Sequence, residues 1–278
     1  MTDPSGGSVA SSDIELALLL EAIYLRFHYD FRHYSKVSMK RRIAAALPKL
    51  GCPTISALQE RVLHEPATLP ALLNFLTVQV SDMFRDPPFF RALREHVAAE
   101  LETYPSLKIW VAGCSTGEEV YSLAITLAET KLLERTILYA TDINPDALAR
   151  AETGVFALSR ISSFSENYRL AGGARSLSEY YTAAYGNAVF SRALRERVVF
   201  SDHSLATDNV FAEVQLVSCR NVLIYFERRL QDRALGLFAG ALCRRGFLGI
   251  GARETLQFSP YASSFREIGG KERWYQRC

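Results

Sequence analysis

Hydrophobic and polar positions divide the chain into a helical first part and a second part in which strands alternate with helices. As far as Leu76, apolar residues recur at spacings of three and four, with no alternating pattern, which predicts four helices. Asp13, Ser35 and Thr54 precede the first three helices and are typical N-cap residues. We therefore expect an all-helical domain at the start of the chain.

From Lys108 onward, short apolar runs alternate with helical patterns. Strands are predicted near 108–112, 137–141, 197–201, 214–219 and 246–250, and helices near 117–130, 145–152 and 227–242, with Asn144 capping the second. Such alternation predicts an α/β fold whose mostly parallel sheet has helices on both faces. The stretch 155–196 is too long for a simple crossover, so we expect a small inserted unit of short helical and β pieces.

These patterns divide the chain into four consecutive segments. The first twelve residues are polar and lack the apolar core of a signal peptide. Asp86, followed by two prolines, marks the start of a linking helix, with Asp86 as its N-cap. The expected segments are a disordered tail over 1–12, a helical domain over 13–76, a linker and linking helix over 77–95, and an α/β domain over 96–278 that contains the insert.

The stretch Ile109–Glu119, which reads IWVAGCSTGEE, combines a buried strand, a glycine turn and the start of a helix. Thr116 with Glu119, or Ser115 with Glu118, has the spacing of a capping box. Such a turn lets a ligand approach the backbone, and the helix N-terminus offers free N–H groups.

The next strand ends at Asp142, and an acidic residue there typically holds ribose hydroxyls. The spacing of Gly113 and Gly117 is G-x-x-x-G, not the dinucleotide G-x-G-x-x-G. The two features together indicate a nucleoside cofactor, and S-adenosylmethionine rather than NAD. An ordinary strand–turn–helix with a surface aspartate is the alternative at this point.

Charge is distributed unevenly along the 278 residues. The formal net charge is only +2, which gives no argument for nucleic acid. Residues 26–50, however, carry seven basic residues and one acid, a net +6, against −4 for the remainder. Arg32, Lys36 and Lys40 follow each other at i, i+4 steps and are predicted to share one helix face. This face is either simply solvated or an electrostatic docking site for an acidic helical partner.

The five cysteines are scattered and odd in number. The sequence has no C-x-x-C motif and no Cys/His pair at zinc spacing, so no metal site is predicted. This cysteine usage suits a reducing cytosol, and we expect a cytoplasmic protein. The longest early apolar stretch, Leu16–Phe27, is interrupted by charges and too short to cross a bilayer.

Four stretches resemble the CheR family of chemotaxis receptor glutamate O-methyltransferases, and the resemblance covers nearly the whole chain. They are LTVQVSDMFRD (76–86) followed by Phe89-Phe90, AGCSTGEE (112–119), ATDI (140–143) and CRNVLIYF (219–226). The resemblance implies a Rossmann-like S-adenosylmethionine-dependent domain with a small inserted β-subdomain, preceded by a helical domain. It also implies a monomer that acts on the cytoplasmic helical region of a chemoreceptor, without membrane insertion or nucleic acid.

The resemblance also implies roles for individual residues. Arg85 and Tyr225 correspond to catalytic positions beside the methionine end of the cofactor and the transferring methyl. The implied cofactor contacts are Gln79, Ser81, Arg85, Gly113, Glu118, Asp142, Ser204, Leu205, Arg220 and Asn221. Substrate docking is implied for Arg32, Lys36 and Lys40. The family often has Asn at position 79, Thr at 81 and Asn at 204, and the insert has no clear match to its glycine-bearing, tail-docking loop.

Methyl transfer to glutamate is an in-line displacement at a sulfonium methyl. The acceptor carboxyl has an unperturbed pKa near ~4.3, so it is already ionised at neutral pH and needs no general base. Alignment of oxygen, methyl and sulfur alone can supply on the order of 7–11 kcal/mol. Two alternatives remain beside glutamate methylation: a methyltransferase with an RNA or small-molecule acceptor, and a non-catalytic scaffold that binds S-adenosylmethionine.

Overall fold

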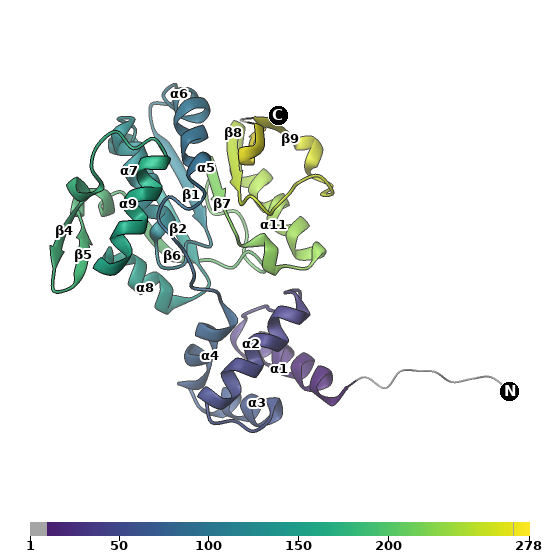
Figure 1. Cartoon of the computed structure of the whole chain (residues 1–278). Helices are drawn as coiled ribbons and strands as arrows, with labels where there is room; N and C mark the ends of the chain where they lie inside the picture. The colour runs from purple at the N-terminus through teal and green to yellow at the C-terminus, as the bar shows by residue number, and fades with distance from the viewer. Residues whose placement is uncertain (1–9, 269) are drawn as a thin grey trace. The chain divides into compact units, whose positions relative to one another are not determined.

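The computed structural model describes residues 10–268 and 270–278 (Figure 1). It divides into two compact units between Val78 and Gln79. Residues 1–9 of the expected tail lie outside the described residues. No helix of the described residues has both the length and the apolar character that crossing a membrane requires.

The first unit consists of α1 (Ser11–Phe27), α2 (Lys36–Lys49), α3 (Ile55–His64) and α4 (Thr68–Leu76), which confirms the all-helical prediction. Its core is built from the apolar stripes, including Leu19, Ile23 and Met39.

Sequence patterns placed the helix starts of this unit with mixed success. The prediction for Thr54 is confirmed, because its hydroxyl accepts a 3.1 Å hydrogen bond from the Ala57 N–H. Ser35 occupies the N-cap position of α2 without a side-chain capping bond. The prediction for Asp13 is wrong: α1 already begins at Ser11, and Asp13 forms an ion pair with Lys40.

The second unit contains a seven-stranded sheet in the order β6-β2-β1-β7-β8-β10-β9. Its strands are β1 (Leu107–Ala112), β2 (Thr136–Asp142), β6 (Val198–Asp202), β7 (Val214–Cys219), β8 (Leu242–Ile250), β9 (Phe265–Ile268) and β10 (Trp274–Arg277). The first five are parallel to one another, as predicted, and β10 is antiparallel to both β8 and β9.

Helices α7 (Glu118–Glu129), α8 (Pro145–Thr153) and α11 (Arg228–Ala241) connect the parallel strands. Figure 1 shows α7 and α8 on one side of the sheet and α11 on the other. Asn144 caps α8 as predicted, accepting hydrogen bonds from the N–H groups of Asp146 and Ala147. The strand order reverses between β1 and β7. In such sheets, ligands bind outside the carboxyl ends of the strands at this switch point.

The segment that precedes β1 belongs to the second unit. It comprises α5 (Pro87–Ala92), a π-helical turn (Leu93–Val97) and α6 (Ala98–Leu101). Phe89 stacks on Trp274 with ring centroids 4.3 Å apart, and the Trp274 indole N–H donates to the Phe89 carbonyl. Of residues 77–95, expected as linker and linking helix, 79–95 belong to the second unit, and α5 packs on the sheet through Phe89.

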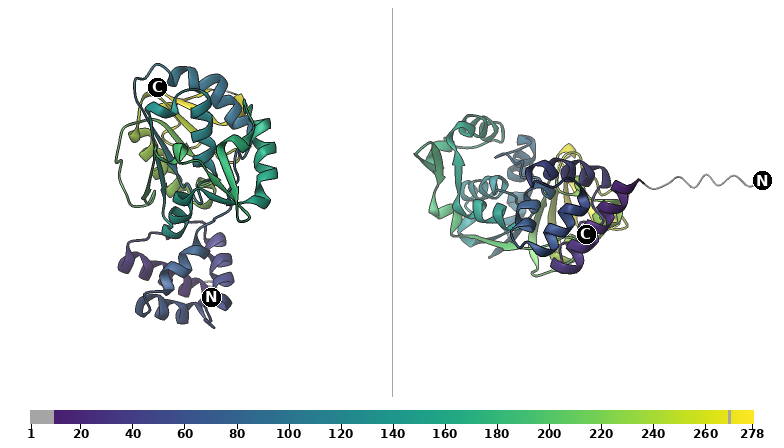
Figure 2. Two further views of the ribbon diagram at one scale, coloured as in Figure 1. Left: turned by 90° about the vertical axis from the view of Figure 1, so that its left-hand side faces the viewer. Right: turned by 90° about the horizontal axis from the view of Figure 1, so that it is seen from below.

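The insert forms the predicted β-subdomain. Strands β3 (Val155–Ala157), β4 (Tyr181–Ala184) and β5 (Asn187–Phe190) make a three-stranded antiparallel sheet. Tyr185 and Gly186 connect β4 to β5, both with positive φ, as a tight hairpin of this hand requires. Helices α9 (Ile161–Leu170) and α10 (Arg192–Arg195) complete the insert, which lies at the periphery of the second unit (Figures 1 and 2).

Candidate functional site

The glycine loop after β1 lies close to two neighbouring segments. Gly113 and Gly117 have φ of 75° and 94°, a region that disfavours residues with a Cβ. A Cβ on Gly113 would lie 2.5 Å from Val222 Cγ2, and one on Gly117 2.9 Å from Ala151 Cβ. The N–H of Gly113 donates to the Thr141 carbonyl on β2. The loop is therefore held tightly, and its glycines let Val222 and Ala151 pack directly against its backbone.

Neither predicted capping box forms at the start of α7. Gly117 occupies the N-cap position, and no side chain caps the helix. The Thr116 hydroxyl donates instead to the Glu118 carboxylate at 2.7 Å. The Glu119 carboxylate accepts from the Ser218 hydroxyl of β7. Both glutamates are thus used for contacts beyond their own helix.

Asp142, at the end of β2, holds the glycine loop in place. Its Oδ2 accepts a 2.8 Å hydrogen bond from the Ser115 N–H, and its Oδ1 accepts from the Asn144 N–H at 2.9 Å. The side chain is buried, and burial raises the pKa of the carboxyl although both hydrogen bonds act to lower it. The two carboxylate oxygens together can accept about four hydrogen bonds, so the group can still accept from a ligand hydroxyl beside its three backbone donors.

Glu118 is fully covered, with 1% of its residue surface exposed. Its Oε1 forms a 2.6 Å ion pair with Arg160, which comes from the insert. Arg160 also donates to the Ser81 carbonyl, lies 3.5 Å from the Asp82 carboxylate and stacks over Phe164. Arg160 thereby fastens Glu118 and Ser81 together. A third predicted residue, Gln79, accepts a 2.9 Å hydrogen bond from the Ser115 hydroxyl of the glycine loop.

Arg220, directly after β7, anchors the segment that carries Arg85. Its side chain is only 1% exposed and lies over the Phe89 ring. Its guanidinium pairs with Glu119 at 3.1 Å and with Asp86 at 2.9 Å, and it donates to the Arg85 carbonyl. Asp86 stands at the expected start of α5, but its carboxylate binds Arg220 rather than capping the helix. Arg220 therefore fixes the backbone at Arg85, whose own side chain is half-buried.

Glu254 plays the corresponding role for the loop after β7. Its Oε2 accepts hydrogen bonds from the N–H groups of Gly251 and Asn221 at 2.6 and 3.0 Å, and its Oε1 from that of Ile224 at 3.3 Å. Asn221 has a positive φ of 59° and begins this loop. The loop ends in a short helical turn (Leu223–Tyr225). A single buried carboxylate thus positions two predicted site residues, Asn221 and Tyr225.

Stability of the folded state is expected to decrease as the pH rises above the ordinary Glu254 pKa of 4.5. Burial raises the pKa of this carboxyl, so the folded protein retains the proton where the unfolded chain has lost it. The resulting stabilisation is complete below pH 4.5 and is lost as the pH passes through the folded-state pKa. Urea unfolding from about pH 4 to about pH 7 should show a shallower decline for Glu254→Gln. Equal slopes for variant and wild type would contradict this assignment.

The loop after β6 forms the remaining side of the site. The Ser204 N–H donates to the Asp208 carboxylate at 2.9 Å, and Leu205 is buried. The His203 N–H donates to the Asp142 carbonyl, which joins this loop to the end of β2. The predicted positions Ser204 and Leu205 therefore lie at the same sheet edge as Asp142.

The three predicted docking residues do not share one helix face. Arg32 precedes α2 and pairs with Asp30 at 2.8 Å and with Glu21 at 3.3 Å. Its guanidinium also lies 3.5 Å from the centre of the Tyr24 ring. Counting charges along the sequence missed these partners. Lys36 and Lys40 do lie on the exposed face of α2, beside Arg41.

Two positioning residues, Arg160 and Glu254, were not predicted. The sequence contained a weak signal only for Glu254, a lone acid four residues after a predicted strand. Within the described part of the chain, no three His, Cys, Asp or Glu side chains gather as a metal site would require.

Family comparisons match both units of the chain. Residues 14–77 match the family model described as "CheR methyltransferase, all-alpha domain", and residues 79–271 the one described as "CheR methyltransferase, SAM binding domain". A provisionally named methyltransferase, Cher3, of Pseudomonas putida is 58% identical over 97% of this chain and 99% of its own length. Chemotaxis protein methyltransferases of Listeria monocytogenes and Salmonella typhimurium are 30% and 29% identical, over 82% and 89% of this chain and 84% and 85% of theirs.

Proposed function

The chain belongs to the CheR methyltransferase family, and from this premise we propose that the loops at its switch point form the site in which S-adenosylmethionine methylates chemoreceptor glutamates. The activity is that of an S-adenosylmethionine-dependent protein-glutamate O-methyltransferase. The observation that supports this location best is the convergence of predicted cofactor residues from four loops on one sheet edge. Asp142 and Glu254 hold two of these loops, and Arg220 holds the segment that carries Arg85; all three residues are buried.

The side chains at this edge fit a nucleoside that carries an amino acid. Asp142 has oxygen lone pairs for ribose hydroxyls, and its bond to the Ser115 N–H places the glycine loop beside it. Gln79 contacts the Ser115 hydroxyl, and Glu118 is tied to Thr116 and Arg160, so both help to shape the glycine loop and the start of α7. S-adenosylmethionine supplies an electrophilic methyl group bound to a sulfonium sulfur.

The chain's own residues then have to align the acceptor and exclude water. Arg85 has a guanidinium fork that suits a carboxylate. Tyr225 offers a hydroxyl that can hydrogen-bond an acceptor oxygen. Arg220 fixes the backbone at Arg85, and Glu254 fixes the neighbouring residue of Tyr225 by accepting from the Ile224 N–H. Since the glutamate is ionised at neutral pH, this alignment is the chemistry that the protein contributes.

The test is incubation of the purified chain with methyl-labelled S-adenosylmethionine and cytoplasmic fragments of chemoreceptors. Label that enters the receptor and is released as methanol by mild base marks a carboxyl methyl ester on glutamate. Base-stable label, or label in RNA or a small molecule only, would contradict the proposal. We propose that the enzyme acts in this way as a monomer in the cytoplasm.

We propose that the receptor docks on the exposed face of α2, with Lys36, Lys40 and Arg41 as its cations. Lys40 already pairs with Asp13, and Lys36 and Arg41 form no ion pair among the described residues. Val37, 79% exposed, lies beside them and gives the face an apolar contact. Arg32 is left out because Asp30 and Glu21 compensate its charge.

Changing Lys36 and Arg41 together to Glu is expected to raise the KM for the receptor about tenfold, with kcat and cofactor affinity unchanged. Exposed charges act within a Debye length of ~10 Å at 0.1 M salt, so this variant should also lose much of the salt dependence of KM. The matched control is Arg169→Glu with Arg192→Glu, two exposed arginines in the insert. An equal change in KM for both variants would show that net charge, not this face, matters.

A further inference from the structure

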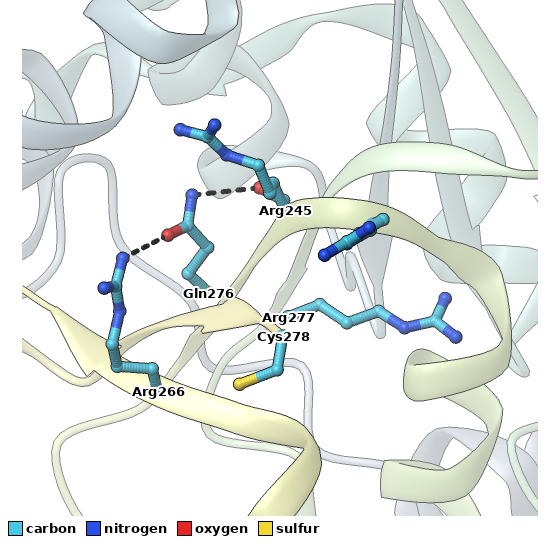
Figure 3. A pocket seen from close by; sticks show the side chains of 6 residues that line it. Arg245, Arg266, Gln276, Arg277 and Cys278 are labelled. Carbon is cyan, nitrogen blue, oxygen red and sulfur yellow. Dashed lines mark hydrogen bonds between the residues drawn. The ribbon is translucent and has the colours of Figure 1, made fainter.

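Four arginines line a hollow of about 380 Å³ at the ends of β8, β9 and β10. The lining residues are Arg244, Arg245, Arg266, Gln276, Arg277 and Cys278 (Figure 3). None of them belongs to the methyl-transfer site. Strand β8 carries Arg245 near its start, and its far end, Ile250, leads into the turn that holds Glu254. Five residues of strand span about 16 Å, so the arginine-lined hollow is separate from the methyl-transfer site.

Gln276 fixes the position of one of these arginines. It is only 4% exposed, and its amide NH₂ group donates to the Glu100 carboxylate at 2.9 Å and to the Arg245 carbonyl at 3.2 Å. Because both acceptors take the nitrogen side, the amide oxygen must face Arg266, which donates to it at 2.7 Å. Figure 3 shows Gln276 between Arg245 and Arg266 in this arrangement.

The arginines are positioned largely without being neutralised. Arg277 is held by the Leu242 carbonyl, and Arg266 by the neutral amide of Gln276. Among the described residues, only Arg245 of the four has an ion-pair partner, Glu100 at 3.0 Å. The four arginines and this glutamate together carry a net charge of +3. Three of the four arginines are exposed, so water screens their mutual repulsion, but their convergence on one hollow gives it a positive potential that attracts an anion.

We propose that this hollow binds a small phosphate-bearing anion with at least two negative charges. A guanidinium presents N–H groups in a fixed fork that matches the oxygens of a phosphate, and several forks together favour a multiply charged group. Pre-positioning of Arg266 and Arg277 by neutral acceptors lowers the entropy lost on binding. The phosphate belongs either to an inorganic polyphosphate or to a nucleotide.

Calorimetric titration of the full-length chain with pyrophosphate and, separately, with ADP tests this inference. Saturating S-adenosylhomocysteine is present throughout, so that neither probe reports on the methyl-transfer site. Saturable binding of pyrophosphate as tight as that of ADP indicates recognition of the phosphates alone. Tighter binding of ADP indicates a nucleotide, and each of these results supports the site.

The variant Arg266→Gln with Arg277→Gln is expected to weaken the binding of the better probe at least ~tenfold. Arg169→Gln with Arg192→Gln removes the same charge from the insert and should leave that affinity unchanged. Arg244→Gln serves as a second variant if the first has a lower melting temperature, because Arg244 is exposed. Absence of saturable binding of both probes, equal loss in the control, or binding of polyglutamate alone would overturn the inference.

Discussion

Asp142→Ala is expected to lower the affinity for S-adenosylhomocysteine by about 10²- to 10⁴-fold. Two charge-assisted hydrogen bonds to the ribose, at roughly 1.5–3 kcal/mol each, correspond to this range. The structure adds a second reason, because the same carboxylate holds the Ser115 N–H of the glycine loop. Loss of Asp142 should therefore remove a cofactor contact and also free the loop that the cofactor approaches.

Calorimetry on two further variants separates these contributions. Asp202 lies opposite Asp142 on the neighbouring strand β6. It is exposed and lies outside the glycine loop. Asp202→Ala removes only a neighbouring charge that acts on Asp142, so its change in affinity should be small beside that of Asp142→Ala. In Asp142→Asn, one amide oxygen can still accept a single backbone hydrogen bond, so its loss of affinity should be intermediate. Unchanged affinity in Asp142→Ala would show that the ribose lies elsewhere.

Hydrophobic periodicity sufficed to predict the central parallel strands and their helices. Strand 214–219 and helix 227–242 were predicted within one or two residues of β7 and α11. Strands β9 and β10 were not predicted, since they are four residues long and packed into the sheet edge by residues distant in sequence. The contact of Trp274 with Phe89, for example, joins positions 185 residues apart.

Local capping rules failed where a tertiary contact was stronger. Asp86 and Glu119 have the spacing and chemistry of helix-capping residues, yet both carboxylates bind the buried Arg220. A buried guanidinium needs charged partners, and this requirement outweighs a capping bond that contributes about 1 kcal/mol. Rules that consider four neighbouring residues cannot detect a partner more than a hundred residues away.

In the candidate site, too, local sequence motifs predicted some residues, whereas residues whose partners are distant in sequence were missed. Glycine spacing and the acid at the end of the second strand predicted where a cofactor binds. The residues that position the site, Arg160 and Glu254, act through partners 42 and 33 residues away. The docking prediction for Arg32 failed for a related reason, because Glu21 and Asp30 compensate its charge in the folded unit.

Arg85→Ala and Tyr225→Phe are each expected to lower kcat by about 10²-fold or more while keeping wild-type melting temperatures. Removal of one well-placed hydrogen-bond donor from an active site typically has an effect of this size. Both side chains are half-buried. Arg220 binds the Arg85 carbonyl, and Glu254 binds the N–H of Ile224, the residue before Tyr225. These substitutions should therefore remove the functional side-chain groups and leave the backbone contacts of Arg220 and Glu254 intact.

Single-turnover methylation of a receptor fragment, with enzyme in excess and saturating S-adenosylmethionine, measures this effect without interference from product release. Arg85→Lys is the informative companion, because it keeps the charge and loses the fork. If Arg85 grips a carboxylate with two parallel hydrogen bonds, the lysine variant should recover only part of the rate. A variant that combines wild-type rate with wild-type melting temperature would place the reacting methyl group away from that residue. If both variants behave in this way, the loops at Arg85 and Tyr225 serve the fold, and the acceptor glutamate is aligned by other residues of the switch point.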